Sequence, residues 1–284
     1  MAIIGFGAHT QRAQAVRLAD EAAAWLRRMG HEVRMLTVAR GDGPPPAAPS
    51  EEMRDLDLVI SLGGDGTMLR TLGLVDGCDV PVLGVNLGNL GYLTVVEPED
   101  LIDSLKRFLA GDYSIESRMR LDVEVRADGG QGAVLLHTSA LNDVVLQRPA
   151  GGHTVRAALS VNDEPFLNYS ADALLVATPT GSTAYNLSAR GPVLSPLGRA
   201  LIVTPVAPHM LFDRSLVLDA GESVSIEPLD ERAAEVVIDG WAAPCLRPGE
   251  VLTCRQAAMD ARLVTFCDRD YLDILKHKFN LVEP

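Results

Sequence analysis

The sequence predicts two domains, an α/β domain followed by a mostly β domain. Apolar strand-like segments alternate with helix-like segments up to about residue 113, which is the pattern of a parallel sheet. Beyond that point the chain changes to short β-rich runs separated by glycine, asparagine and proline turns. The length of 284 residues is enough for two domains that each bury a core.

The first domain is expected to contain strand–helix–strand units. Apolar residues between Val16 and Met29 recur at helical spacing, and Gly30 follows them as a helix end. The proline-rich stretch at 41–50 is expected to be a surface loop or linker. The expected strands are 3–6, 33–38, 58–62 and 81–85, and the remaining expected helices are 67–75 and 98–109.

The second domain is expected to be built from β-strands joined by tight turns, with a short amphipathic helix at 271–279 that packs against the rest. Turn signals fall at Gly129-Gly130, Gly151-Gly152, Asn162-Asp163 and Pro248-Gly249. The expected strands are 120–126, 134–146, 155–161, 173–177, 201–206, 215–218, 224–227, 235–238 and 251–254.

Composition excludes several classes of function. The formal charge of -13 and the lack of a Lys/Arg cluster argue against a nucleic-acid partner. No apolar run reaches the roughly 20 residues that span a bilayer, and the apolar start has no basic leader, so we expect no membrane partner and a cytoplasmic location. The four cysteines show no C-x-x-C spacing and the six histidines are scattered, which argues against a zinc site.

A glycine-rich loop with one carboxylate follows the apolar strand-like segment at 56–62. Three glycines between positions 63 and 66 allow a sharp turn with exposed backbone N–H groups, and a helical pattern follows. The N-terminus of a helix attracts anions, so this loop suits a phosphate group. Asp65 would repel phosphate unless it accepts a proton from a hydroxyl or helps to hold a metal ion. The alternative is a simple turn, because Gly-Gly-Asp-Gly is also common turn chemistry.

A second glycine-rich loop, residues 86–94, follows the strand expected at 81–85. Loops at the carboxyl ends of parallel strands line the crevice in which such sheets bind ligands. In this loop Asn86 offers an amide and Tyr92 an aromatic face to a nucleotide. The alternative is a β-turn followed by a buried tyrosine.

Four hydroxyl side chains gather in the segment 178–183, directly after the strand expected at 173–177. Ser182 is expected to be the N-cap of a helix that runs to Ala189, which leaves N–H groups and hydroxyls for a ligand. Tyr185, one turn into that helix, is placed to stack on a ring. A row of four hydroxyls exceeds what capping requires, so the segment predicts a binding site.

Asn142 and Asp143 interrupt a strand whose neighbouring residues are apolar. Buried polar groups need hydrogen-bond partners, and the two hydroxyls of a ribose would supply them. A β-bulge or an edge position is the alternative explanation for this pair.

Taken together, these segments resemble the bacterial NAD kinases. The Gly-Gly-Asp-Gly-Thr loop alone is shared with lipid kinases of the diacylglycerol and sphingosine type. The Thr-Pro-Thr-Gly-Ser-Thr-Ala-Tyr run and the Asn-Leu-Gly-x-Leu-Gly-aromatic loop are similar to NAD kinases specifically. The similarity covers most of the chain in the family's order, over residues 63–69, 86–94, 118–121, 141–146, 172–192, 204–209 and 238–240.

The resemblance implies a fold and a reaction. The fold would be a Rossmann-like α/β domain over 1–113, a β-sandwich over 114–258 and a C-terminal segment, 259–284, that packs back on the first domain. The reaction would transfer the γ-phosphoryl of ATP, with polyphosphate as an alternative donor, to the 2′-hydroxyl of the adenosine ribose of NAD and so give NADP. Mg²⁺ would arrive with ATP and not at a fixed protein site. The protein would be a homo-oligomer, either a dimer or a tetramer.

The resemblance also implies roles for individual residues. Asp65 would be catalytic, because it would orient the ribose hydroxyl and finally deprotonate it, and Tyr92 would lie against adenine. The residues that would bind the substrates are Gly64, Gly66, Thr67, Asn86, Tyr92, Asn142, Asp143, Asp172, Thr180, Thr183, Ala184, Tyr185 and Ser188.

Three residues depart from the family pattern. Ala173 stands where a glycine usually follows the aspartate, and Trp241 stands where a polar residue is common. Arg190 replaces the first glycine of the Ser-Ala-Gly-Gly-Pro turn. Arg190 therefore either demands a different turn conformation or places a cation near a substrate phosphate.

Three other functions compete with this interpretation. A dehydrogenase is suggested by Gly5-Phe6-Gly7 after the first strand, but Thr10 stands where the dinucleotide fingerprint requires glycine. A lipid kinase would share the Asp65 loop, and a non-enzymatic sensor would bind NADP without turnover. The choice between NAD and NADH, for which Ser170 is the position to inspect, stays open, as do the phosphoryl donor, the oligomer and any effectors.

Overall fold

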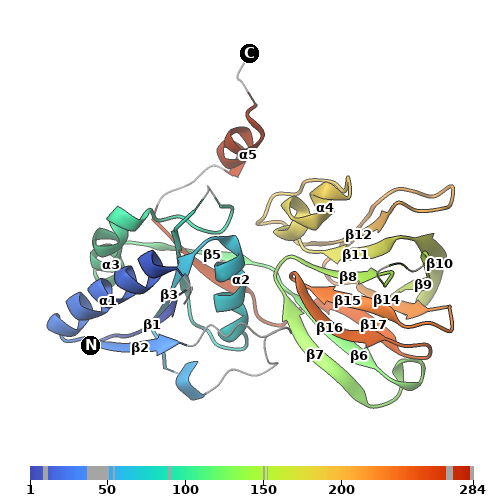
Figure 1. The fold of residues 1–284 in the computed structure, drawn as a ribbon, viewed down its shortest axis with the longest axis horizontal. Coiled ribbons are helices and arrows are strands. Elements are labelled where there is room, and N and C mark those ends of the chain that lie inside the picture. Colours follow the sequence, from blue (N-terminus) through green and yellow to red (C-terminus); the bar gives the residue numbers. More distant parts are fainter. Residues whose placement is uncertain are drawn as a thin grey trace. The chain divides into compact units, whose positions relative to one another are not determined.

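The computed structural model describes residues 1–8, 12–36, 51–53, 55–88, 91–149, 151, 153–266 and 271–281. The chain divides into two units (Figure 1). Unit 1 comprises residues 1–40, 48–117 and 261–284, and unit 2 comprises residues 41–47 and 118–260. The predicted loop at 41–50 lies outside the described residues. None of the described helices is long and apolar enough to cross a membrane.

Unit 1 is built on one six-stranded sheet in the order β2-β1-β3-β4-β18-β5. Strand β1 runs parallel to β2 and β3, and β4 runs parallel to β3 and β18. The parallel, doubly wound arrangement is the one predicted from the alternation of strands and helices. The strands are β1 (Ile3–Ala8), β2 (Glu32–Leu36), β3 (Leu58–Gly63), β4 (Val82–Asn86), β5 (Ser114–Arg118) and β18 (Ala261–Thr265).

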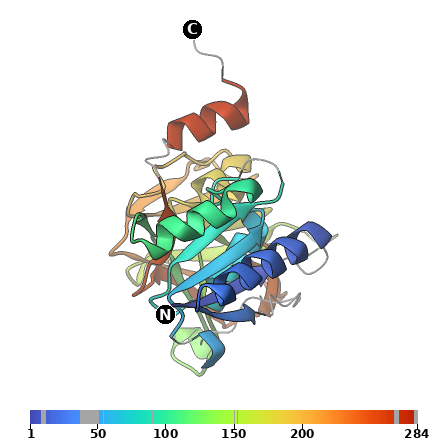
Figure 2. The same cartoon turned by 90° about the vertical axis from the view of Figure 1, so that its left-hand side faces the viewer.

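Helices lie on both faces of this sheet. Figure 1 shows α1 (Ala13–Arg28) and α3 (Leu101–Leu109) on one side of the strands and α2 (Asp65–Leu74) on the other, and Figure 2 looks onto the α1 and α3 side. The apolar stripes of α1 and α3 pack with strand residues in one core cluster. Two short 3₁₀ turns, Glu51–Met53 and Pro98–Asp100, precede β3 and α3.

The last strand of unit 1 comes from the end of the chain. Strand β18 lies between β4 and β5, so the sheet is completed by residues more than 140 positions after its other strands. Val264 is 1% exposed and belongs to the same core cluster as Leu83 and Val85. After β18, α5 (Tyr271–Phe279) follows with no buried side chain.

Unit 2 consists of two six-stranded sheets, ordered β10-β9-β14-β17-β6-β7 and β13-β12-β11-β8-β15-β16, in which every strand pair is antiparallel. The strands of the first sheet are β6 (Leu121–Arg126), β7 (Val134–Ala140), β9 (Val155–Val161), β10 (Glu164–Ala171), β14 (Ser223–Pro228) and β17 (Val251–Gln256). Those of the second are β8 (Asp143–Gln147), β11 (Ala173–Ala177), β12 (Ala200–Val206), β13 (Leu216–Asp219), β15 (Ala234–Ile238) and β16 (Trp241–Leu246).

One hydrophobic core joins the two sheets of unit 2. Strands β6 and β15 alternate buried and half-buried residues, as expected of sheets with one face in a core. Strand β11 is buried at every position, because a second apolar cluster on the other face of its sheet includes Leu175, Ile202 and Leu194. The segment between β11 and β12, which carries a 3₁₀ turn (Gly181–Thr183) and α4 (Tyr185–Ser188), is therefore a covering layer of the sheet.

The structure corrects several predicted elements. The run 134–146 is not one strand, since it breaks at residues 141–142 and passes from the first sheet to the second. Helix α2 begins at Asp65, two residues before its predicted start. Strands β5, β10 and β16 were absent from the prediction, because they are edge strands with many exposed residues and lack an apolar pattern. Strand β18 was also absent, although it lies inside the sheet of unit 1. The turn at Asn162-Asp163 is confirmed, with φ of 52° and 64° between β9 and β10.

Removal of buried methyl groups from β18 should destabilise unit 1. Val264→Ala removes two methyl groups from the core and should lower the free energy of unfolding by about 2 kcal/mol. Val16→Ala is the matched control, because Val16 is 40% exposed on α1. Urea denaturation followed by circular dichroism measures both. Equal losses in the two variants would show that β18 is not part of the core.

Candidate active site

The two glycine-rich loops of unit 1 lie side by side at the carboxyl edge of its sheet. Strand β3 ends at Gly63 and leads into the Asp65 loop, and the neighbouring parallel strand β4 ends at Asn86 and leads into the second loop. The backbone N–H of Leu87 donates to the carbonyl of Gly63 over 2.9 Å. This edge is where open parallel sheets bind ligands.

The Asp65 carboxylate connects these two loops. One oxygen accepts the backbone N–H of Tyr92 at 2.9 Å, and the other accepts that of Leu93 at 3.0 Å. Gly91 must be glycine, because a Cβ there would collide with the carboxylate. Each carboxylate oxygen keeps a further lone pair for a hydroxyl or a metal ion. The Asp65 carboxylate is therefore held in one orientation and can still accept a hydrogen bond or bind a metal ion.

Gly64 and Gly66 flank Asp65 on the open side of the loop. A Cβ on either glycine would have no atom within 4 Å, so their backbone is free of side-chain cover. Gly64 is the N-cap of α2, and the first N–H groups of a helix attract anions. The side chain of Thr67 is buried and packs against Gly63.

Asn86 and Tyr92 have roles inside the second loop itself. The Asn86 side-chain oxygen accepts the N–H of Gly88 at 3.1 Å, and its amide donates to Glu97 at 3.4 Å. The Tyr92 hydroxyl is buried without a hydrogen-bond partner among the described residues. Burial, and then the charge of Asp65, raise the pKa of Tyr92, so its phenol stays neutral.

In unit 2 a buried carboxylate fixes the start of β8. Asp239, which follows β15, accepts the backbone N–H groups of three consecutive residues, Leu141 at 2.7 Å, Asn142 at 2.7 Å and Asp143 at 3.0 Å. The backbone N–H of Asp239 donates in return to the carbonyl of Asp143 at 2.9 Å. Sequence reasoning did not name Asp239 as a site residue. The available signal was an acidic residue directly between an apolar strand and a glycine.

Asp143 and Asp239 form a coupled pair of buried carboxyl groups. Burial, and then the charge of Asp239, raise the pKa of Asp143 to about 7, although the backbone N–H of Tyr185 donates to it and lowers the value. Burial also raises the pKa of Asp239, whereas the three N–H donors and then Arg120 lower it. Since only an ionised carboxylate accepts three such bonds without a clash, we assign the negative charge of the pair to Asp239.

The segment after β11 packs tightly on the other side of Asn142. The backbone N–H of Thr178 donates to the Asn142 carbonyl at 2.9 Å, and the Thr178 hydroxyl donates to the Leu141 carbonyl at 2.5 Å. Gly181 lies against the Asn142 carbonyl so closely that a Cβ would overlap it. The structure thus brings Asn142 and Asp143 together with the segment that carries Thr180, Thr183, Ala184 and Tyr185.

The row of hydroxyls separates into structural and available groups. Ser182 is fully buried, where it donates to the Pro179 carbonyl at 2.6 Å and accepts the N–H of Leu194 at 3.0 Å. Ser182 is therefore not the N-cap of α4, because α4 begins at Tyr185. Thr183 is only half-buried, and Tyr185 is 40% exposed. Thr180 is buried beside Arg118, while Ser188 is exposed at the end of α4.

Asn186 is a second structural residue that sequence reasoning did not single out. Its amide donates to the Ser182 and Pro192 carbonyls, and its oxygen accepts the Thr204 hydroxyl at 2.7 Å. A Cβ on Gly191 would overlap the Asn186 side chain. Asn186 therefore links the residues before and after α4 through a network of buried hydrogen bonds.

Asp172 lies at the opposite end of unit 2 from the other predicted dinucleotide residues. It precedes β11, whereas Thr178 follows that strand, and a strand of this length separates the two by about 20 Å. Asp172 is on the surface, where its carboxylate pairs with Arg148 at 3.1 Å. Ser170 is at the same end and shares a hydrogen bond of 3.3 Å with Thr154.

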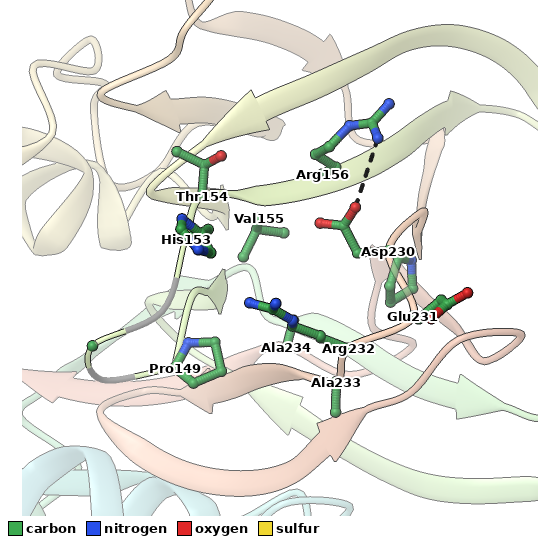
Figure 3. Close-up of a pocket in the computed structure, with 12 residues that line it drawn as sticks. Pro149, His153, Thr154, Val155, Arg156, Asp230, Glu231, Arg232, Ala233 and Ala234 are labelled. Carbon is green, nitrogen blue, oxygen red and sulfur yellow. Dashed lines mark ion pairs between the residues drawn. The ribbon is translucent and has the colours of Figure 1, made fainter.

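A cavity of about 600 Å³ lies at this same end of unit 2, between the turn after β8 and the turn after β14 (Figure 3). Its walls include His153, Arg232 and an ion pair of 3.7 Å between Arg156 and Asp230. It contains none of the predicted site residues. The candidate site residues therefore lie in the loops around Asp65 in unit 1 and in the segments around Asn142 and Tyr185 in unit 2, and this cavity is not part of them.

Comparison with known proteins decides the family. The N-terminal part, residues 4–113, matches the ATP-NAD kinase N-terminal domain, and residues 141–266 match the ATP-NAD kinase C-terminal domain. An NAD kinase of Heliobacterium modesticaldum is 38% identical over 281 residues, which cover 98% of each chain. One from Syntrophotalea carbinolica is 37% identical over 97% of each chain. The chain belongs to the NAD kinase family.

Solved structures of NAD kinase relatives share the fold. An NAD kinase from Archaeoglobus fulgidus in complex with ATP has a TM-score of 0.73 and 26% identity, with 99% of each chain covered. The yeast NADH kinase complexed with NADH has a TM-score of 0.89 at 21% identity and covers 100% of this chain and 89% of that chain. The predicted fold class and the resemblance to NAD kinases are both confirmed.

The family departure at Arg190 has a structural consequence. Arg190 has a φ of 64°, so the chain keeps the left-handed turn that glycine adopts without strain. The turn ends α4, with the N–H of Gly191 donating to the Asn186 carbonyl at 2.8 Å. Ala173 is buried at the start of β11, and Trp241 begins β16.

Restoring glycine at position 190 should stabilise the protein. Arg190→Gly relieves the left-handed strain and should raise the free energy of unfolding by about 1 kcal/mol. Arg190→Ala is the matched control, since alanine keeps the Cβ and should give no such gain. Thermal and urea denaturation measure both variants. A gain that is equal in both would assign the effect to the lost charge.

Replacing Asp143 should change how stability depends on pH. Its pKa is raised from 3.8 to about 7 in the fold, so its contribution is present below pH 3.8 and is lost as the pH rises through about 7. Asp143→Asn cannot ionise, and its stability relative to the unmodified protein should therefore rise over that interval and level off above it. Urea denaturation at several pH values measures the difference. Asp213→Asn, which removes an exposed carboxylate, is the matched control, and a profile for Asp143→Asn that does not differ from it would contradict the assignment.

Proposed function

We propose that this chain transfers the γ-phosphoryl of ATP to the 2′-hydroxyl of the adenosine ribose of NAD, giving NADP and ADP. The observation that carries the proposal is the Asp65 carboxylate, held by two backbone N–H groups between two open glycine-rich loops. Membership of the NAD kinase family over nearly the whole chain supports it. The relative from Archaeoglobus fulgidus was solved in complex with ATP.

The proposed reaction requires that the ribose hydroxyl and the γ-phosphate be positioned in line, and it needs no covalent intermediate with the protein. A bond forms between the ribose oxygen and the γ-phosphorus, the bond from that phosphorus to the ADP oxygen breaks, and Asp65 accepts the ribose proton late in the step. The backbone of Gly64 and Gly66 and the N-terminus of α2 favour the negative phosphates. Asn142, Asp143, Thr180, Thr183, Ala184, Tyr185 and Ser188 of unit 2 are the proposed dinucleotide contacts.

We propose Mg²⁺ as the divalent ion that arrives with ATP. No group of three or more His, Cys, Asp or Glu side chains that could hold a metal lies among the described residues. Mg²⁺ is commonly held by substrate phosphates with one or two carboxylates, and the free lone pairs of Asp65 fit that pattern. When bound, the ion would neutralise charge that develops on the phosphates.

NADP formation tests the proposed function. Purified protein with NAD, ATP and Mg²⁺ should produce NADP, and omission of the metal or of ATP should stop it. The same assay with NADH in place of NAD tests which dinucleotide accepts the phosphoryl group. The assay with polyphosphate in place of ATP tests which compound donates it. Absence of product from folded protein, with diacylglycerol phosphorylated instead, would support the lipid-kinase alternative.

Asp65→Asn should abolish most of the turnover. Asparagine keeps the size and one acceptor but cannot take the ribose proton, so kcat should fall by roughly 10²- to 10⁴-fold. Binding of NAD, measured by calorimetry, should survive, because the change leaves the proposed dinucleotide contacts of unit 2 in place and relieves repulsion with phosphate. Near-normal turnover in the folded variant would show that the Asp65 carboxylate is not the base.

We further propose a homo-oligomer in which Asp172 serves the dinucleotide of a second copy. The support is the separation of about 20 Å along β11 between Asp172 and the other dinucleotide residues of its own chain. The Asp172 carboxylate lies on the surface at that end, where it pairs with Arg148 and is accessible to another subunit.

Subunit complementation tests the shared site. Asp65→Asn and Asp172→Ala should each be nearly inactive alone, whereas a co-expressed mixture should regain activity. The gain would come from mixed oligomers, in which one site receives intact Asp65 from one copy and intact Asp172 from the other. No gain in a mixture that sedimentation shows to be mixed would place Asp172 in its own chain's site.

A further inference from the structure

A lysine from the C-terminal helix covers the ring of Tyr92. The ammonium of Lys278 lies 3.9 Å from the centroid of that ring. This is a cation–π contact, in which the positive charge is attracted to the negative face of the ring. The hydroxyl end of Tyr92 is buried, so the ring is fixed at one end and meets Lys278 on its face.

The helix that carries Lys278 is lightly attached. Helix α5 has nine residues and none of their side chains is buried. Leu272 is 58% exposed and Phe279 is 49% exposed, whereas Tyr271, Ile274 and Leu275 are half-buried, so the helix is only partly packed. A helix this short is marginal by itself in water, which makes its displacement inexpensive in free energy.

Tyr92 also links the covered ring to the catalytic carboxylate. Its backbone N–H is one of the two donors that hold Asp65. The residue under Lys278 is therefore the same residue that orients the proposed base. A change at the face of the Tyr92 ring therefore occurs on the residue that hydrogen-bonds the Asp65 carboxylate.

We propose that Lys278 and the adenine of the dinucleotide compete for the face of Tyr92, so that α5 is a cap which the nucleotide displaces. The proposal rests on the proposed function, in which adenine lies against this ring. One face cannot hold an ammonium at 3.9 Å and a stacked base together. Lys278 thereby lowers the affinity for the dinucleotide and keeps the ring covered until it binds.

The size of the effect follows from the strength of the contact. Cation–π contacts at exposed sites are weak, so loss of this one should tighten binding of NAD roughly two- to five-fold. Lys278→Met keeps an apolar stem and removes the charge. Lys276→Met is the matched control, because Lys276 is on the same helix and pairs with Asp273 at 3.5 Å.

Calorimetry with NAD at fixed ionic strength measures this competition. Lys278→Met should bind NAD more tightly than the unmodified protein, and Lys276→Met should match the unmodified protein. Equal or weaker binding by Lys278→Met would overturn the proposal, because Lys278 would then be neutral or a contributor to binding.

Hydrogen exchange tests the cap without any turnover. Saturating NAD should speed amide exchange in residues 271–281, and Tyr92→Leu should speed it in the absence of any nucleotide. Protection of α5 by NAD would show that the helix closes on the ligand, which contradicts a displaced cap. If the unmodified protein makes no NADP, the proposed function fails. If it makes NADP but Lys278→Met binds no tighter, only the cap fails.

Discussion

In each unit, a carboxylate that accepts backbone N–H groups from a neighbouring segment fixes the residues that are proposed to bind substrate. In unit 1, Asp65 after β3 holds the loop that follows β4, and in unit 2, Asp239 after β15 holds the residues that begin β8. Both depend on strands that lie next to each other but are distant in sequence. The loops that offer groups to a ligand are thus positioned by charge-assisted hydrogen bonds from their main chain to a carboxylate.

The site retains groups that lower the stability of the fold. Burial and then the charge of Asp239 raise the pKa of Asp143 to about 7, and Arg190 keeps a backbone conformation that favours glycine. Both residues flank α4 or contact its first turn. Strain and burial of this kind are common where a protein holds polar groups ready for a ligand.

Local patterns predicted the elements whose burial is regular. Strands β9 and β11 and helix α5 have the predicted bounds, because their apolar spacing or turn signals are local. Strand β10 was missed because most of its side chains are exposed, and β18 because only the parallel sheet of unit 1 gives it a partner. Pairing over such distances is not encoded in any short segment.

Residue chemistry predicted which site segments come together within each unit, but not how each group is used. The loops around Asp65 and Tyr92 meet as expected from the parallel sheet. Ser182 and Asn186 make hydrogen bonds within their own segment of the chain. The sequence did not predict this role, because the burial of a hydroxyl or an amide depends on tertiary contacts. Asp172 lies at the other end of β11, and the sequence alone did not indicate which end of a strand faces a ligand.

Transfer of labelled phosphate tests the central claim most directly. With ATP labelled at the γ-phosphorus and unlabelled NAD, the account predicts that the label appears in NADP as an equal amount of ADP forms, with none bound to the protein. Label that stays on the protein, or that appears only as inorganic phosphate while NADP does not form, would contradict direct transfer at the Asp65 loop.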